Sequence, residues 1–251
     1  MSWILLRGLT REARHWGTFV SQFEAQLAPA QVIALDLPGN GQFYQHTSPL
    51  NVHGMVTFAR QQLLTQDIRP PYHLMAMSLG AMVAIDWAQR YPQEIERLVL
   101  INTSMRPFST ITQRLRPHNW MALLALAARW NDMDYTERCI HRLTCNQLDQ
   151  RTADLKAWHQ IRRSAPVSSV NALRQLAAAS RFACVVQTPR CPVLVLSSDA
   201  DRLVNPQCST LLAVAWQATH HSHPWAGHDL PHDDARWVCE HVADWLLLLN
   251  L

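Results

Sequence analysis

Residues 72–81, YHLMAMSLGA, decide the fold of this chain. A short apolar run ends abruptly at Ser78, and apolar residues at helical spacing begin directly after it. A strand that turns this sharply into a helix needs small residues two positions before and two positions after the serine, because their side chains nearly collide. Ala76 and Gly80 meet that requirement. The stretch therefore predicts a strand, a sharp turn with a serine at its apex, and a helix.

The length and composition indicate a packed globular protein. The chain has 251 residues, of which 48% are apolar and 16% charged, enough for one large domain or one domain with an inserted cap. The formal net charge of +3 is too small to indicate a nucleic-acid partner. No run of about 18 apolar residues occurs, so we expect no transmembrane helix. Residues 1–8 are too short and wrongly flanked for a signal peptide, and the cysteines lack CxxC spacing, so we expect a cytoplasmic protein with free thiols.

Strand patterns and helix patterns alternate near both ends of the chain, as in a parallel sheet built from strand–helix–strand units. Strand patterns occur at residues 3–7, 31–36, 72–77, 97–102, 191–196 and near 219–223. From about 107 to 182 only helical patterns occur. We therefore predict an α/β fold, with a mostly parallel sheet of about six strands flanked by helices and a helical cap inserted after the fourth strand. The predicted core comprises residues 1–106 and 183–251, and the predicted cap comprises residues 107–182.

The motifs and their order resemble the α/β-hydrolase superfamily. Beyond the serine turn, residues 36–41 (DLPGNG) closely resemble the Asp-x-Pro-Gly-x-Gly turn of that family, with Asn40 where His is usual. The resemblance covers nearly the whole chain, which looks most like the small capped serine carboxylesterases, including the pimeloyl-carrier methyl esterase type. It implies a sheet without the two antiparallel strands that usually begin it, because this chain starts at the strand that leads to the oxyanion loop.

The resemblance also implies a catalytic triad in the chain order Ser, acid, His. Ser78 is a weak nucleophile by itself and needs a base within hydrogen-bond reach and a third group to orient that base. The stretch after the fifth strand pattern resembles the family's acid loop and favours Asp201 as the acid, while Asp199 remains the alternative. The Gly227-His228 pair, shortly before the final helix, resembles the family's histidine loop and makes His228 the predicted base.

Two backbone N–H groups are expected to form the oxyanion hole. One belongs to Leu79, directly after the nucleophile, and the resemblance implies that the other belongs to Leu9, in the loop after the first strand. The family usually has His-Gly there, followed by a tryptophan eight residues after the glycine. This chain has Arg7-Gly8, with Trp16 at that spacing. Arg7 departs from the pattern, which affects the packing of the loop rather than the backbone donor.

The sequence predicts no metal site and no cofactor. His220, His221 and His223 lie close together, but no further ligands accompany them at a recognised spacing. Gly39 and Gly41 lack the third glycine of a dinucleotide-binding motif, so no NAD site is expected. The cap also carries arginines that we interpret as a solvated face, with a docking patch for an acidic acyl carrier protein as the alternative. Among them are Arg114, Arg116, Arg162 and Arg163.

The function implied by the resemblance is acyl transfer to water, with a small-molecule ester or acyl compound as substrate. Ser78 would carry the acyl group and His228 would move the proton, which makes the protein a carboxylesterase. A serine nucleophile argues against the dehalogenase and epoxide-hydrolase branches, which use a carboxylate. Three alternatives remain: an acyl thioesterase acting on acyl-CoA or an acyl carrier, a lyase of the menaquinone-pathway type, and a catalytically silent hydrolase fold that binds a ligand.

Overall fold

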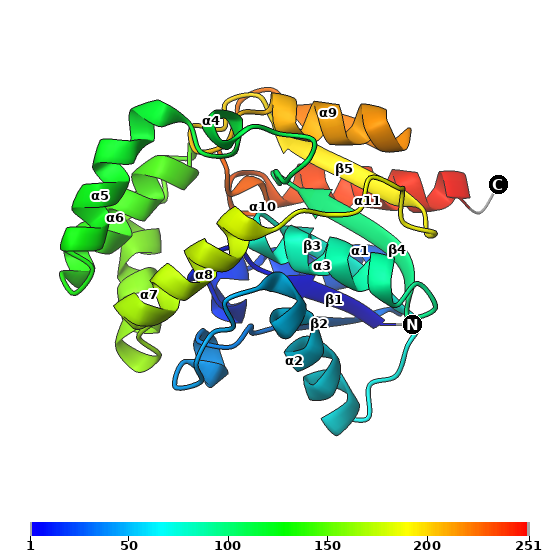
Figure 1. Ribbon diagram of the computed structural model, residues 1–251, viewed down its shortest axis with the longest axis horizontal. Coiled ribbons are helices and arrows are strands. Elements are labelled where there is room, and N and C mark those ends of the chain that lie inside the picture. Colours follow the sequence, from blue (N-terminus) through cyan, green and yellow to red (C-terminus); the bar gives the residue numbers. More distant parts are fainter. Residues whose placement is uncertain (1, 250–251) are drawn as a thin grey trace.

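The computed structural model describes residues 2–249, and its centre is a parallel sheet of six strands (Figure 1). The strands are β1 (Ser2–Leu6), β2 (Gln31–Leu35), β3 (Tyr72–Met77), β4 (Ile95–Ile101), β5 (Val193–Ser198) and β6 (Thr219–His223). They lie in the order β2-β1-β3-β4-β5-β6, and all neighbouring pairs are parallel. The predicted fold class is confirmed, and the described part of the chain lacks the two antiparallel strands that usually begin the family's sheet.

The central strands are apolar on both faces, because helices cover both sides of the sheet. Every residue of β3 and of β5 is buried. Side chains of a strand alternate between faces, so Ile4 and Leu6 of β1 pack into one hydrophobic core, while Trp3 and Leu5 pack into the other. Continuous burial of this kind is typical of parallel sheets. In contrast, β6 reads THHSH and lies at the edge of the sheet, where most of its residues are exposed.

Two groups of helices form the layers on either side of the sheet. The first core is shared with α2 (Val52–Thr65), α3 (Leu79–Arg90) and α9 (Gln207–Trp216). The second core is shared with α1 (Phe19–Leu27) and α11 (Ala235–Leu249). Two short 3₁₀ helices, η1 (Ala13–Trp16) and η2 (Gly41–Phe43), lie in the connections after β1 and β2. Within residues 2–249, no helix is both long enough and apolar enough to cross a membrane.

The connection between β4 and β5 is long and mostly helical. Its helices are α4 (Ile111–Arg114), η3 (Pro117–Asn119), α5 (Trp120–Ala128), α6 (Met133–Thr144), α7 (Arg151–Ser164) and α8 (Ser169–Arg181). α5, α6 and α7 stand beside the carboxyl ends of the strands, and α8 leads back along the core toward β5 (Figure 1). Open α/β sheets bind their ligands at that edge. The insertion lies where the sequence placed the cap, and the boundaries of the cap at 107 and 182 remain a prediction.

α8 is fixed to the core by buried amide side chains. Asn171 accepts a hydrogen bond from the backbone N–H of Ser48 at 2.9 Å. Gln175, one turn further on, accepts from the N–H of Thr10 at 2.8 Å and donates to the side chain of Asn40 at 2.8 Å. Asn40 stands where the family usually has His. Its side-chain oxygen accepts the hydrogen bond from Gln175, which joins the Pro-Gly turn to the cap.

Candidate active site

Ser78 lies at the sharp turn between β3 and α3. Its backbone has a φ of 52° and a ψ of −118°, a conformation that non-glycine residues rarely adopt and that is concentrated at functional sites. The turn is held by hydrogen bonds from the Ser78 N–H to the carbonyl of Ile101 (3.0 Å) and from the Thr103 hydroxyl to the Ser78 carbonyl (3.1 Å). A Cβ on Gly80 would lie 2.5 Å from the carbonyl oxygen of Leu6, so glycine is needed for this approach of α3 to β1.

His228 and Asp201 form a buried pair. Nδ1 of His228 lies 2.7 Å from Oδ2 of Asp201, and the two residues are 4% and 1% exposed. The other oxygen of Asp201 accepts hydrogen bonds from the N–H groups of Leu203 (2.8 Å) and Val204 (3.0 Å), which fix the carboxylate. A carboxylate at Nδ1 keeps the ring proton there and leaves the lone pair of Nε2 free to act as a base.

The structure separates the two candidate acids. Asp199 follows β5 directly, and its N–H bonds to the carbonyl of His223 in β6 at 2.9 Å, which keeps it at the edge of the sheet. Its side chain is exposed and accepts a hydrogen bond from the hydroxyl of Ser222. Of the two carboxylates, Asp201 is the one bonded to His228. The geometry therefore favours the acid that the loop pattern favoured.

The surroundings of His228 raise its pKa. Burial alone would lower the pKa of the imidazole, because the charged ring would be poorly solvated. Attraction to Asp201, the hydrogen bond with Asp201 and attraction to Asp229 outweigh that effect and place the pKa above the ordinary value of 6.5. The imidazolium that forms when the ring accepts a proton is thereby stabilised, as general-base catalysis requires.

Ser78 and His228 line the same cavity, which has a volume of about 120 Å³. The wall is mainly apolar. The cap contributes apolar side chains from α5, from α6 and from the connection between them, namely Leu123, Leu126, Trp130, Ile140 and Leu143. Leu203, from the acid loop, also lies in the wall. An apolar wall of this kind favours contact with the apolar part of a ligand.

The two predicted oxyanion donors lie near Ser78. Leu79 is the first residue of α3, so its N–H has no acceptor one turn earlier in the helix. Leu9 lines the cavity, in the loop after β1. That loop runs close to the nucleophile, since a Cβ on Gly8 would lie 3.1 Å from the Cβ of Ser78. The N–H groups of Leu79 and Leu9 remain the predicted oxyanion hole.

Arg7, which departs from the family's pattern, forms a buried ion pair with Asp229. Its terminal nitrogens donate to the two carboxylate oxygens at 2.9 and 2.5 Å, and the guanidinium carbon lies 4.8 Å from the ring centre of Trp16. Burial would raise the pKa of Asp229, but attraction to Arg7 and the hydrogen bonds from it keep that pKa below its ordinary value. The pair joins the loop after β1 to the residue that follows His228. Sequence analysis missed this link, because its members are 222 residues apart and no local pattern marks them.

The segment that follows α6 is bound to the histidine loop, residues 225–233. The carboxylate of Asp233 accepts three backbone N–H groups, those of Asn146 (2.8 Å), Gln147 (2.9 Å) and Gly227 (2.6 Å). A Cβ on Gly227 would lie 2.5 Å from the carbonyl oxygen of Thr144, so the two segments pack closely. The loop that carries the candidate base is therefore held by the cap as well as by the core.

Of the four cap arginines named from the sequence, three bond to the protein itself, which corrects the expectation of a solvated face. Each donates to a backbone carbonyl: Arg114 to Ala179 at 2.6 Å, Arg116 to Asp201 at 2.7 Å, and Arg162 to Trp130 at 2.6 Å. Arg163 is exposed, as expected. Arg116 supports the acid loop from the cap side, and docking of an acyl carrier at the cap remains a prediction.

The neighbouring histidines of β6 bond and pack in different directions. Nε2 of His220 lies 2.8 Å from the hydroxyl of Ser197, His221 packs against His241, and Nε2 of His223 lies 3.2 Å from the carboxylate of Asp234. Burial lowers the pKa of His220 and of His221, because both rings are poorly solvated when charged. These contacts give the three residues a role in packing the edge of the sheet.

Comparison with known proteins agrees with this architecture. A family model described as "Alpha/beta hydrolase family" matches residues 3–241. Among the curated proteins, no sequence matches the chain significantly. The family match covers the sheet, the insertion and each of the candidate site residues.

Three solved structures illustrate the shared fold. The thermophilic esterase from Thermogutta terrifontis has 20% sequence identity and a TM-score of 0.79, over 100% of this chain and 91% of that one. The enol-lactonase from Burkholderia xenovorans LB400 has 18% identity and a TM-score of 0.80, over 98% and 91%. An alpha/beta hydrolase fold protein from Chitinophaga pinensis has 16% identity and a TM-score of 0.74, over 98% and 89%. At such identities the likeness concerns the fold.

Replacing Asp229 by Asn should strongly destabilise the protein. The charge of Arg7 would stay buried without its counterion, which costs about 3–5 kcal/mol in the free energy of unfolding. Equilibrium unfolding in urea, followed by circular dichroism, measures the change. The matched control is Asp67→Asn, which removes the partner of Arg69 from a pair whose side chains are 81% and 78% exposed, and which should cost less than about 1 kcal/mol. Equal effects of the two substitutions would contradict the importance of the buried pair.

Proposed function

The chain belongs to the alpha/beta hydrolase family, and from this premise we propose that it is a serine hydrolase that cleaves carboxylic esters through an acyl-enzyme on Ser78. One observation carries the proposal: Ser78, at its strained turn, lines one cavity with His228, whose Nδ1 is bonded to Asp201. A hydroxyl, a base and a carboxylate that orients the base are the parts that an activated serine nucleophile requires.

In the proposed reaction, Nε2 of His228 takes the proton of the Ser78 hydroxyl while the serine oxygen attacks the ester carbonyl. The N–H groups of Leu79 and Leu9 donate hydrogen bonds to the oxyanion that develops. When the tetrahedral intermediate collapses, the alcohol leaves with the proton from His228, and the acyl group stays on Ser78. His228 then accepts a proton from water, whose oxygen attacks the acyl-enzyme, so that the acid is released and the serine hydroxyl is restored.

The proposed substrate is a small ester with an apolar group beside the reacting carbonyl. The leucines of α5 and α6 provide apolar contact in the cavity, and burial of apolar surface contributes about 25 cal/mol per Å². The charged groups in the wall include Arg7 and Asp229, which neutralise each other. A thioester of an acyl-CoA or acyl carrier would present the same acyl group to these residues. Rates on an ester and a thioester of equal acyl length separate the two leaving groups.

A fluorophosphonate probe should form a single covalent adduct on Ser78, because the probe reacts with activated serines. Intact-mass measurement and peptide mapping identify the labelled residue. Ser78→Ala and His228→Ala should both remove the adduct, while Ser222→Ala, which changes an exposed hydroxyl at the edge of the sheet, should keep it. An adduct on another serine, or labelling that survives His228→Ala at the original rate, would overturn the assignment.

The rate of acylation should rise with pH through an apparent pKa above 6.5, the ordinary value for a histidine. His228 acts as a base only when neutral, and its raised pKa holds the proton to higher pH, so activity is low on the acid side. Asp201→Asn removes two effects that raise this pKa, so the residual activity should titrate at lower pH. The pH profile of kcat/KM measures both values. A wild-type inflection below 6.5 would contradict this account of His228.

Asp201→Asn should lower kcat by about 10⁴-fold, because an amide at this position favours the wrong tautomer of the histidine. Asp199→Asn is the matched control, since it neutralises a carboxylate two residues away that bonds to Ser222 instead of His228. Its kcat should stay within a few-fold of the wild type. Steady-state kinetics of both variants on one ester measure the two losses in kcat. A larger loss of kcat in Asp199→Asn than in Asp201→Asn would make Asp199 the acid.

A further inference from the structure

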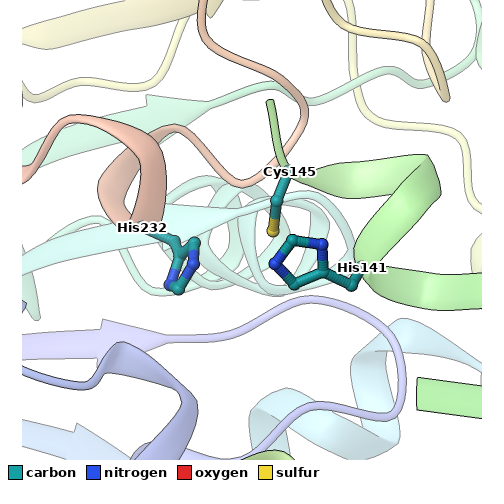
Figure 2. Close-up of side chains that lie close together, drawn as sticks. All are labelled: His141, Cys145 and His232. Carbon is teal, nitrogen blue, oxygen red and sulfur yellow. The ribbon is translucent and has the colours of Figure 1, made fainter. Parts of the chain in front are cut away.

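Three potential metal ligands converge where the cap meets the histidine loop. His141 lies on α6, Cys145 follows the end of that helix, and His232 lies on α10 (Leu230–Asp233). One ligand atom from each residue lies within 4.8 Å of the other two. Figure 2 shows the three side chains turned toward one another, with His141 and Cys145 at the end of α6 and His232 on a distant segment of the chain. The cluster shares no residue with His220, His221 and His223, the histidines of β6 that the sequence analysis weighed as a metal site.

We propose that His141, Cys145 and His232 bind a zinc ion that ties α6 to the histidine loop. Imidazole and thiolate groups are the ligands that Zn²⁺ prefers in proteins, and Mg²⁺ or Ca²⁺ would require oxygen ligands instead. His141 and Cys145 are four residues apart, which places them on one face at the end of α6. His232 completes the set from the core side. The ion would displace the thiol proton of Cys145 to solvent and bind the resulting thiolate.

Asp154 is placed to orient the two imidazoles from outside the ligand set. It lies on α7, and its Oδ2 is 3.1 Å from Nε2 of His141 and 3.1 Å from Nε2 of His232. A carboxylate bonded to one ring nitrogen of a ligating histidine leaves the other ring nitrogen for the metal. Among the described residues, Nδ1 of His141 is buried and has no hydrogen-bond partner. With three protein ligands, the fourth position of a tetrahedral ion would be taken by water. With one thiolate and two neutral imidazoles as ligands, and the Asp154 carboxylate beside both imidazoles, the charge of the ion would be balanced. This balance matters here, because an uncompensated charge in a buried site is costly.

The separations fit an ion with a small adjustment. Ligands of a tetrahedral zinc ion lie about 3.3–3.6 Å from one another, given zinc–nitrogen and zinc–sulfur distances of about 2.0–2.3 Å. The three atoms that include the sulfur lie within 4.8 Å, so binding would draw them together by about 1 Å. Rotation of the Cys145 side chain about its one flexible bond provides such a movement.

The surroundings exclude water on one side and admit an ion on the other. His141 and Cys145 are fully buried, and the ring of Trp158 packs 5.3 Å from the ring of His141 and 5.6 Å from that of His232, measured between centres. The side chain of His232 remains 17% exposed. A zinc ion would therefore enter along His232 and come to rest against apolar side chains, which strengthen its bonds to the ligands.

The consequence is a metal-mediated link between the cap and the loop of the candidate base. His232 follows His228 by four residues, and the remaining ligands, His141 and Cys145, lie at the end of α6. The metal would add to the hydrogen bonds that Asp233 already makes with the segment after α6. Its role would be structural, since neither Ser78 nor His228 belongs to the ligand set.

Cobalt titration of the metal-free full-length protein tests the proposal, with absorbance as the readout. Co²⁺ should bind as one ion per chain, with a thiolate-to-cobalt charge-transfer band and the d–d bands of a tetrahedral ion, and Zn²⁺ should displace it. Cys145→Ser should lose the charge-transfer band and weaken zinc binding by about 10-fold or more. The matched control is Cys139→Ser, which removes another buried thiol of the same helix and should keep the band.

His232→Gln provides a second variant on the more exposed ligand. In the wild type, zinc should raise the midpoint of thermal unfolding and a chelator should reverse the rise, because an ion that binds only the folded state stabilises it. His232→Gln should show a much smaller zinc-dependent shift than Cys139→Ser. Absence of a cobalt spectrum and of a zinc-dependent shift in the wild type would overturn the proposal and leave a hydrogen-bonded cluster. Neither readout uses hydrolysis, so this outcome is independent of the proposed function.

Discussion

The close packing of α3 against the end of β1 is the constraint on which the rest of the structure depends. Gly80 and Gly8 are the residues that permit it, since a Cβ at Gly80 would meet the backbone of β1 and a Cβ at Gly8 would crowd Ser78. The approach forces Ser78 into its unusual backbone conformation and brings the loop that carries Leu9 beside it. One contact between a helix and a strand thus determines where the hydroxyl stands and where two backbone donors stand relative to it.

Buried charged groups hold the histidine loop, the second part of the site, in one arrangement. The histidine loop contains two carboxylates with different tasks: Asp229 neutralises Arg7, and Asp233 accepts backbone N–H groups from its own loop and from the segment after α6. Groups of this kind are costly when unpaired, so they stabilise one arrangement at the expense of others. Arg7 replaces the family's usual His, and the ion pair gives the physical reason why the substitution is compatible with the loop.

The parts of the site that the sequence could predict are those encoded by residues a few positions apart. The serine turn depends on small neighbours of Ser78, and the acid loop presents Asp201 next to the N–H groups that hold it. The number of strands also followed from local patterns. Contacts between distant segments left no such signal. Arg7 pairs with Asp229, and Arg116 donates to the carbonyl of Asp201, because the fold brings distant loops together. A helical pattern in the sequence indicates only which face of the helix is polar.

The supports of the Asp201–His228 pair come from both sides of the molecule. Arg116, in the cap, donates to the carbonyl of Asp201, and the cap segment after α6 donates to Asp233 in the histidine loop. Docking of the cap and alignment of the pair are therefore linked equilibria, in which each stabilises the other by the same free energy. A ligand that holds the insertion in place would therefore also hold the carboxylate of Asp201 and the loop of His228 in their observed arrangement.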